Sequence, residues 1–141
     1  MLRVRQLRRD ERVLVDGHHR LVVICGFHHV QLAMPRGKED EAERFYDGLL
    51  GLKRVTKPAE LQARGGAWFR DAGVEVHLGV EDDFRPARKA HPAFIVDGLD
   101  ELRDRLRAAQ VETLDDTQLE GQRRFYAADP FGNRLEFIER D

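Results

Sequence analysis

The sequence has too little cysteine, too short an apolar run and too little net charge for several classes of protein. Its one cysteine, Cys25, excludes an internal disulfide framework and a zinc site built from several cysteines. Its longest apolar run, residues 21–25, is far shorter than the roughly 20 residues that cross a membrane. A formal net charge of −2 and a pI near 6.3 argue against a general positive field for nucleic acid. We therefore expect a cytoplasmic protein that binds neither nucleic acid nor a membrane.

The composition that remains is that of an ordinary globular domain, with 41% hydrophobic and 35% charged residues in a chain of 141. A chain of this length normally forms one domain with a core that needs no cross-links. Residues 1–25 carry six arginines against three acidic residues. Because a signal peptide needs a longer apolar segment, we interpret residues 1–25 as an N-terminal extension, poorly ordered or contributing one extra strand. Residues 26–141 are expected to form a single domain.

Two similar halves are visible in that domain, one over about residues 27–80 and one over about residues 91–139. In each half, an alternating, strand-like stretch precedes an amphipathic helical stretch, and three more strand-like stretches follow it. Asp97 or Asp100 is expected to cap the second helix. The expected strands are 27–35, 53–57, 67–71, 74–80, 91–96, 111–114, 124–128 and 134–139, with helices over about 42–50 and 99–109. This order predicts an α+β fold of two βαβββ modules packed side by side.

Three histidines and one glutamate occupy matching positions in the two halves. Successive residues of a strand point to opposite faces, and the alternation places His29, His77, His91 and Glu136 opposite the apolar face. His29 and His91 are 62 positions apart, which is close to the length of the repeating unit. A lone histidine on a strand is more often a hydrogen-bonded surface group, but four matching positions favour a shared site. Imidazole and carboxylate ligands suit a divalent ion such as zinc, nickel, manganese, iron or cobalt.

Five motifs connect these positions to a known family. They are HHVQLAM at 28–34, EAERFYDGLLGL at 41–52, VEVHLGV at 74–80, HPAFIVDGLDEL at 91–102 and DPFGNRLEF at 129–137. With them, residues 27–139 resemble the vicinal oxygen chelate superfamily of glyoxalase I, bleomycin-resistance proteins, fosfomycin-resistance thiol transferases, methylmalonyl-CoA epimerase and extradiol dioxygenases. The resemblance implies a curled mixed sheet that forms a U-shaped cup around a metal, with the helices on its outer face. It also implies a homodimer, in several members with ligands from both chains.

The resemblance assigns roles to the four matching residues. His29, His91 and Glu136 match the ligands on the first, fifth and eighth strands of the family. His77 stands where glyoxalase I generally has a glutamate, and where the thiol transferases leave the metal to the other three ligands. Glu136 is therefore the one ligand carboxylate that can move a proton, and we expect it to act as the catalytic general base.

Six further residues are candidates for substrate binding. Gln31 and Glu75 share the ligand face of their strands, and Glu75 is equally consistent with simple hydrogen bonding beside the site. Arg85 and Arg88 lie in the segment between the halves, where they suit an anionic substrate or an exposed linker. Aromatic wall positions are expected at Trp68 and Tyr126.

The leading functional hypothesis is a metal-dependent, glyoxalase-like enzyme of the lyase or isomerase type. The metal would act as a Lewis acid that stabilises an enediolate or alkoxide on a small metabolite. The alternative is a metal-free ligand- or drug-sequestering protein of the bleomycin-resistance type. Thiol transfer and extradiol ring cleavage on the same fold also stay open, because a fold alone does not select a reaction.

Overall fold

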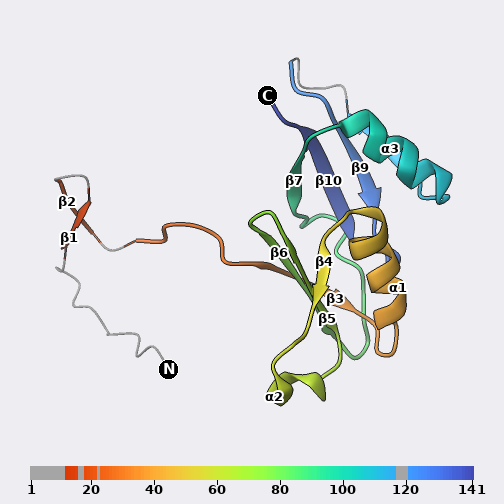
Figure 1. Ribbon diagram of the computed structural model, residues 1–141, viewed down its shortest axis with the longest axis horizontal. Coiled ribbons are helices and arrows are strands. Elements are labelled where there is room, and N and C mark those ends of the chain that lie inside the picture. The colour runs from red at the N-terminus through yellow and green to blue at the C-terminus, as the bar shows by residue number, and fades with distance from the viewer. Residues whose placement is uncertain (1–11, 16–17, 22, 117–120) are drawn as a thin grey trace.

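The computed structural model describes residues 12–15, 18–21, 23–116 and 121–141 (Figure 1). Strands β1 (Arg12–Val15) and β2 (His18–Leu21) form an antiparallel pair that lies apart from the other elements. The remaining residues of the predicted N-terminal extension up to position 22 lie outside the described residues. Within the described part, the extension contains two paired strands, whereas the sequence suggested at most one. The domain boundary near residue 26 stays a prediction.

The first module contains β3 (Val30–Met34), α1 (Glu39–Glu43), the π-helix η1 (Arg44–Leu49), β4 (Lys53–Val55), α2 (Ala59–Gln62), β5 (Ala67–Asp71) and β6 (Val74–Val80). Its strands form one sheet in the order β3-β6-β5-β4. Strands β3 and β6 are parallel, and the other neighbouring pairs are antiparallel. Helix α2 was not predicted, because its four residues are too few to carry a helical apolar stripe.

The second module repeats this order with β7 (Ala93–Val96), α3 (Leu99–Ala108), β8 (Thr113–Asp116), β9 (Arg124–Ala128) and β10 (Arg134–Glu139). Its sheet has the equivalent order β7-β10-β9-β8. The predicted α+β class and tandem modules are confirmed. The two sheets stay separate and do not close into one, so that β3 and β7 are both edge strands. Strands β7 and β8 each begin two residues later than the sequence predicted, and β3 begins three residues later. His29 and His91 therefore precede their strands instead of lying within them.

One hydrophobic core joins the two modules, and it lies between the sheets and the helices. Each sheet buries its apolar face there, and α1, η1 and α3 supply the other side. The largest fully buried apolar side chains are Met34, Tyr46, Phe69, Leu78, Leu99, Leu106, Phe125, Leu135 and Phe137. Figure 1 shows α1 and α3 on the same side of the molecule. Where η1 and α3 meet, Nη1 of Arg105 donates to the carbonyl oxygen of Leu49 at 3.0 Å.

The turn between β9 and β10 fastens the second module to the first. The buried carboxylate of Asp129 accepts hydrogen bonds from the Tyr46 hydroxyl at 2.7 Å and from Nδ2 of Asn133 at 2.9 Å. The same amide nitrogen donates to the carbonyl oxygen of Ala33 in β3 at 2.8 Å. Burial, with the charge of Asp129 beside it, raises the pKa of Tyr46 well above its ordinary 10.0. These bonds hold β3 and β10 in a fixed relation.

The N-terminus of α3 is capped differently from the sequence prediction. Its first N–H groups, those of Gly98 and Leu99, donate to the Glu139 carboxylate at 3.3 and 3.0 Å. Asp97 instead forms an ion pair with Arg140, and the Asp100 side chain forms no capping hydrogen bond. The prediction was wrong because Glu139 belongs to a strand that local sequence does not place beside the helix. A distant carboxylate satisfies the same orphan donors as a local cap.

Candidate metal centre

Each four-stranded sheet has one face in the core and one face turned away from it, which we call the open face. Strand register sets which residues share a row, because residues opposite each other point to the same side. In the first sheet, His77 lies between Gln31 and Trp68. In the second, Glu136 lies between Ala93 and Tyr126. The open faces therefore carry predicted site residues from both modules.

His91 and Glu136 form the closest pair of predicted ligands. Nε2 of His91 lies 3.1 Å from Oε2 of Glu136, and Nδ1 of His91 lies 2.8 Å from the carbonyl oxygen of Lys89. Since a carbonyl oxygen only accepts, Nδ1 carries the hydrogen, and in the tautomer without a second hydrogen Nε2 would present its lone pair to the carboxylate. Two facing acceptors need a positive charge between them, either a proton or a metal ion. Two ligands about 2.1 Å from one ion would lie about 3.0–3.4 Å apart, which fits this pair.

Arg124 fixes the other oxygen of Glu136. Its Nη1 donates to Oε1 of Glu136 at 3.0 Å, and its Nη2 donates to Oδ2 of Asp116 at 2.9 Å. Oε1 is therefore occupied, and Oε2 stays directed toward His91. Such outer contacts orient metal ligands and tune their affinity. Sequence reasoning did not identify Arg124, although strand alternation places it on the same face as Tyr126.

The first module stacks three aromatic rings on its open face. The ring of His77 lies parallel to Trp68 at 4.0 Å between centroids and nearly parallel to His29, also at 4.0 Å. Nε2 of His77 lies 3.1 Å from Oε1 of Glu75. Burial lowers the pKa of His77, and the nearby Glu75 only partly opposes this, while the hydrogen bond to His77 lowers the pKa of Glu75. His77 is thus a buried ring held on both faces, and His29 at the end of the stack is exposed.

The four predicted ligands lie in two pairs. In the described part of the chain, no group of three or more histidine, cysteine, aspartate or glutamate side chains is close enough to hold a metal ion. His29 and His91 both line a groove of about 1380 Å³, along with residues of the edge strands β3 and β7. Gln31, Glu75 and Arg85 also line this groove, and Arg88 does not. One chain therefore brings His29 and His91 to a common groove without converging them on one point.

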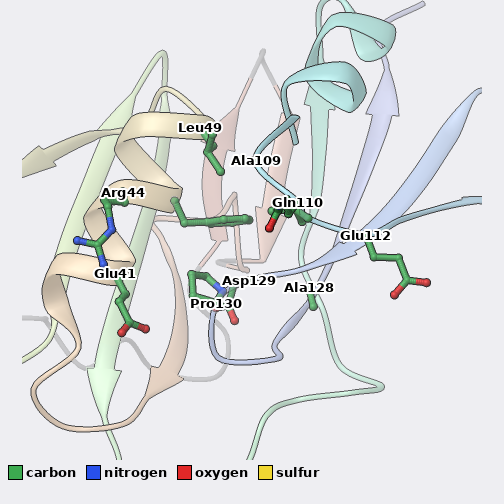
Figure 2. Close-up of a pocket in the computed structure, with 11 residues that line it drawn as sticks. Glu41, Arg44, Leu49, Ala109, Gln110, Glu112, Ala128, Asp129 and Pro130 are labelled. Atoms are coloured by element: carbon green, nitrogen blue, oxygen red, sulfur yellow. The ribbon is translucent and has the colours of Figure 1, made fainter. Parts of the chain in front are cut away.

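A smaller pocket of about 430 Å³ lies on the helical side of the molecule, as Figure 2 shows. Arg44 and Glu41 lie on its η1 and α1 wall, and Gln110 and Glu112 follow α3 on the other wall. It contains none of the predicted site residues. The Asp129 carboxylate at its edge is already saturated by its hydrogen bonds to the β9–β10 turn and Tyr46. The chemistry expected from the sequence therefore lies on the open faces.

No helix among the described residues is both long and apolar enough to cross a membrane. The family model described as the Glyoxalase/Bleomycin resistance protein/Dioxygenase superfamily matches residues 26–137. The chain belongs to this superfamily. The resemblance inferred from the five motifs is thereby confirmed. Members of the superfamily include glyoxalases, fosfomycin-resistance proteins and dioxygenases, and membership alone does not select among their reactions.

Solved structures of superfamily members share this fold. A glyoxalase family protein from Bacillus anthracis is 46% identical, with a TM-score of 0.81 over 85% of this chain and 98% of that one. The fosfomycin resistance protein FosX from Listeria monocytogenes is 19% identical, with a TM-score of 0.69 over 84% of this chain and 96% of that one. A glutamate-to-glutamine mutant of FosX was solved with Mn(II) and 1S,2S-dihydroxypropylphosphonic acid, at 18% identity, a TM-score of 0.71 and coverage of 84% and 95%. Among curated proteins, no sequence matches this chain.

Proposed function

We propose that this superfamily member is a divalent-metal-dependent, glyoxalase-like enzyme of the lyase or isomerase type that acts on a small metabolite. The observation that carries the proposal is the 3.1 Å approach of His91 Nε2 to Glu136 Oε2. The second nitrogen of the ring and the second oxygen of the carboxylate are each held by another group. Both ligand atoms are therefore oriented before any ion binds, which is how metal sites gain affinity.

The donor set fits a borderline divalent ion. His91 and Glu136 would hold it from the second module and His29 from the first, through neutral imidazoles and one carboxylate. Bound there, the ion would supply Lewis-acid stabilisation of negative charge that develops on substrate oxygens. The candidate ions are zinc, nickel, manganese, iron and cobalt. The Mn(II) complex of the structural relative FosX supports manganese among them. We assign His77 to positioning, because its Nε2 already faces Glu75 and its ring supports that of His29.

Glu136 is the proton-transfer group in this proposal. Arg124 occupies Oε1, so that Oε2 would both hold the ion and, when it loosens from the ion, take and return a proton. The side chain is buried, with a residue exposure of 6%, which limits competition from bulk water. The wall beside it is Tyr126, directly opposite in the strand register. Substrate would lie on this face.

We further propose that a second copy of the chain completes the site. Among the described residues, the edge strands β3 and β7 each have one side without a partner strand. Phe27, shortly before β3, and Ile95, within β7, are 95% and 71% exposed. Leu114, in the same row as Glu136 and Tyr126, is 59% exposed. Exposed apolar side chains around a site indicate that the surface of another molecule packs against them. A two-fold partner would bring His29 of one chain to the His91–Glu136 pair of the other. A cytoplasmic location stays a prediction.

Turnover by reconstituted protein tests this function. Metal-free protein is loaded with each candidate ion and assayed with 2-oxoaldehyde–thiol adducts, epoxides and catechols. We expect turnover of one substrate class with a preferred ion, lost in Glu136→Gln and retained in Glu112→Gln. Glu112 is an exposed glutamate that forms no side-chain hydrogen bond or ion pair with the described residues. Stoichiometric binding of a ligand by the metal-free protein, without turnover by any metal-loaded form, would instead favour the sequestering alternative.

A further inference from the structure

Arg134 lies on the open face of the second sheet, two residues before Glu136 on β10. Its Cζ atom is 4.2 Å from the centroid of the Tyr126 ring. Tyr126 is the residue directly opposite Glu136 in the β9–β10 register. The Arg134 guanidinium is therefore stacked on the aromatic wall of the candidate metal centre.

The charge of Arg134 is not neutralised by the described residues. The neighbouring Arg124 spans two carboxylates, those of Glu136 and Asp116. The side chain of Arg134 forms no ion pair or hydrogen bond with the described part of the chain, and its backbone N–H donates to the carbonyl oxygen of Ala87. It is only partly exposed, so water screens its charge less than at an open surface. Arginine side chains are seldom buried, even in part, without a charged partner. The unpaired N–H donors of Arg134 are therefore suited to binding a ligand.

Stacking on Tyr126 prepares the guanidinium for a directed contact. The ring covers one flat face and restrains the side chain, while the N–H groups at the edge stay free. That edge matches two oxygens of a carboxylate or a phosphate at once. Arg85 and Arg88, the anion-binding candidates from the sequence, lie in the segment between the modules and share neither strand nor face with Glu136.

We propose that Arg134, stacked on Tyr126, binds an oxyanion group of the substrate beside the His91–Glu136 pair. This inference rests on the proposed function and narrows it to a small metabolite that carries a carboxylate or phosphate near its reacting oxygens. The Arg134 subsite fixes the substrate's orientation, and Glu136 acts on the part that projects past Tyr126.

Titration of metal-free, full-length protein with sodium acetate and with inorganic phosphate tests the subsite, with the Tyr126 ring signals followed by NMR. We expect saturable shifts with at least one probe, and the probe that binds more tightly identifies the oxyanion. Arg134→Met should weaken that binding at least about tenfold, because the paired N–H donors are removed. Arg134→Lys keeps the charge but loses the paired N–H donors of the guanidinium. Its affinity for the oxyanion should lie between those of the wild type and Arg134→Met. Arg64→Met, an exposed arginine of the first module, is the control and should match the wild type.

Wild-type protein that shows no saturable shift with either probe, or Arg134→Met that binds as tightly as wild type, would overturn the inference. Circular dichroism confirms that each variant is folded. Glu136→Gln separates the subsite from the metal site, since it removes a metal ligand and a negative charge but leaves Arg134. Oxyanion binding that depends on Arg134 in a protein that binds no metal would uphold the subsite and reject the proposed function. Metal binding without oxyanion binding would uphold the proposed function and reject the Arg134 subsite.

Discussion

Nε2 of His91 lies 3.1 Å from Oε2 of Glu136, although 45 positions separate the two residues in the chain. The parallel pairing of β7 and β10 brings them together, because Glu136 faces Ala93, two residues after His91. Each residue is held again on its far side, by the carbonyl oxygen of Lys89 and by Arg124. This is an oriented pair of ligand atoms.

Arg124 should control metal affinity without touching the ion. Arg124→Met frees Oε1 of Glu136, and we expect metal to bind about 10–100-fold more weakly, the usual effect of losing a contact behind a ligand. Competition with a fluorescent chelator measures the dissociation constant. Arg123 lies one residue earlier and has an exposed side chain, so Arg123→Met is the matched control. An unchanged dissociation constant in folded Arg124→Met would show that this arginine does not position Glu136.

A site shared between two chains should be rescued in mixed dimers. His29→Ala and His91→Ala should each be inactive alone, since each removes one ligand from both sites. In a random mixture, half of the dimers carry both variants, and one of their two sites is intact, so about a quarter of the wild-type activity should return. Coexpression of differently tagged chains and tandem purification supply the mixed dimer. Failure to regain activity in that purified dimer would mean that His29 and His91 act within one chain.

Tyr46 should make the fold sensitive to high pH. Its pKa is raised in the folded protein, so the folded state holds the phenol proton more tightly than the unfolded state does. The resulting stabilisation is complete below the unfolded value of 10.0 and is lost as the pH rises through the folded value. Urea unfolding between pH 9 and 11 should therefore show a falling free energy of unfolding.

Tyr46→Phe should remove that part of the pH dependence. It should also cost about 1–3 kcal/mol at neutral pH, because the buried Asp129 carboxylate loses a donor. A wild-type protein and a Tyr46→Phe variant with the same slope above pH 10 would contradict this account of the junction between the modules.

The sequence allowed the modules and the sheet face of Glu136 to be predicted, because alternation along a strand is a local property. It predicted a strand over 91–96, whereas β7 begins at Ala93 and His91 precedes it. It did not show that Arg124 would bridge Glu136 and Asp116, since that contact depends on how β8, β9 and β10 are paired. The same applies to Arg134, which shares the face of Glu136 but whose stacking on Tyr126 crosses two strands. Local patterns give the face of a residue, and only the register gives its neighbours.

Two other differences have the same origin. The cap of α3 comes from Glu139, some 40 residues away, and no local rule selects it over Asp97 or Asp100. The expected curled mixed sheet is divided into two four-stranded sheets, with free edges at β3 and β7. Whether two edges meet depends on the packing between modules or between chains, which alternation within one strand does not encode.

The central claim is that His91 and Glu136 hold a divalent ion, and metal content tests it most directly. Elemental mass spectrometry is carried out on untagged protein purified without chelators, for the wild type, His91→Ala, Glu136→Ala and the control Glu112→Gln. We expect about one ion per chain in the wild type and the control, and a loss of that ion in both His91→Ala and Glu136→Ala. Equal metal content in all four proteins, or no metal in the wild type even after divalent ions are offered, would contradict it.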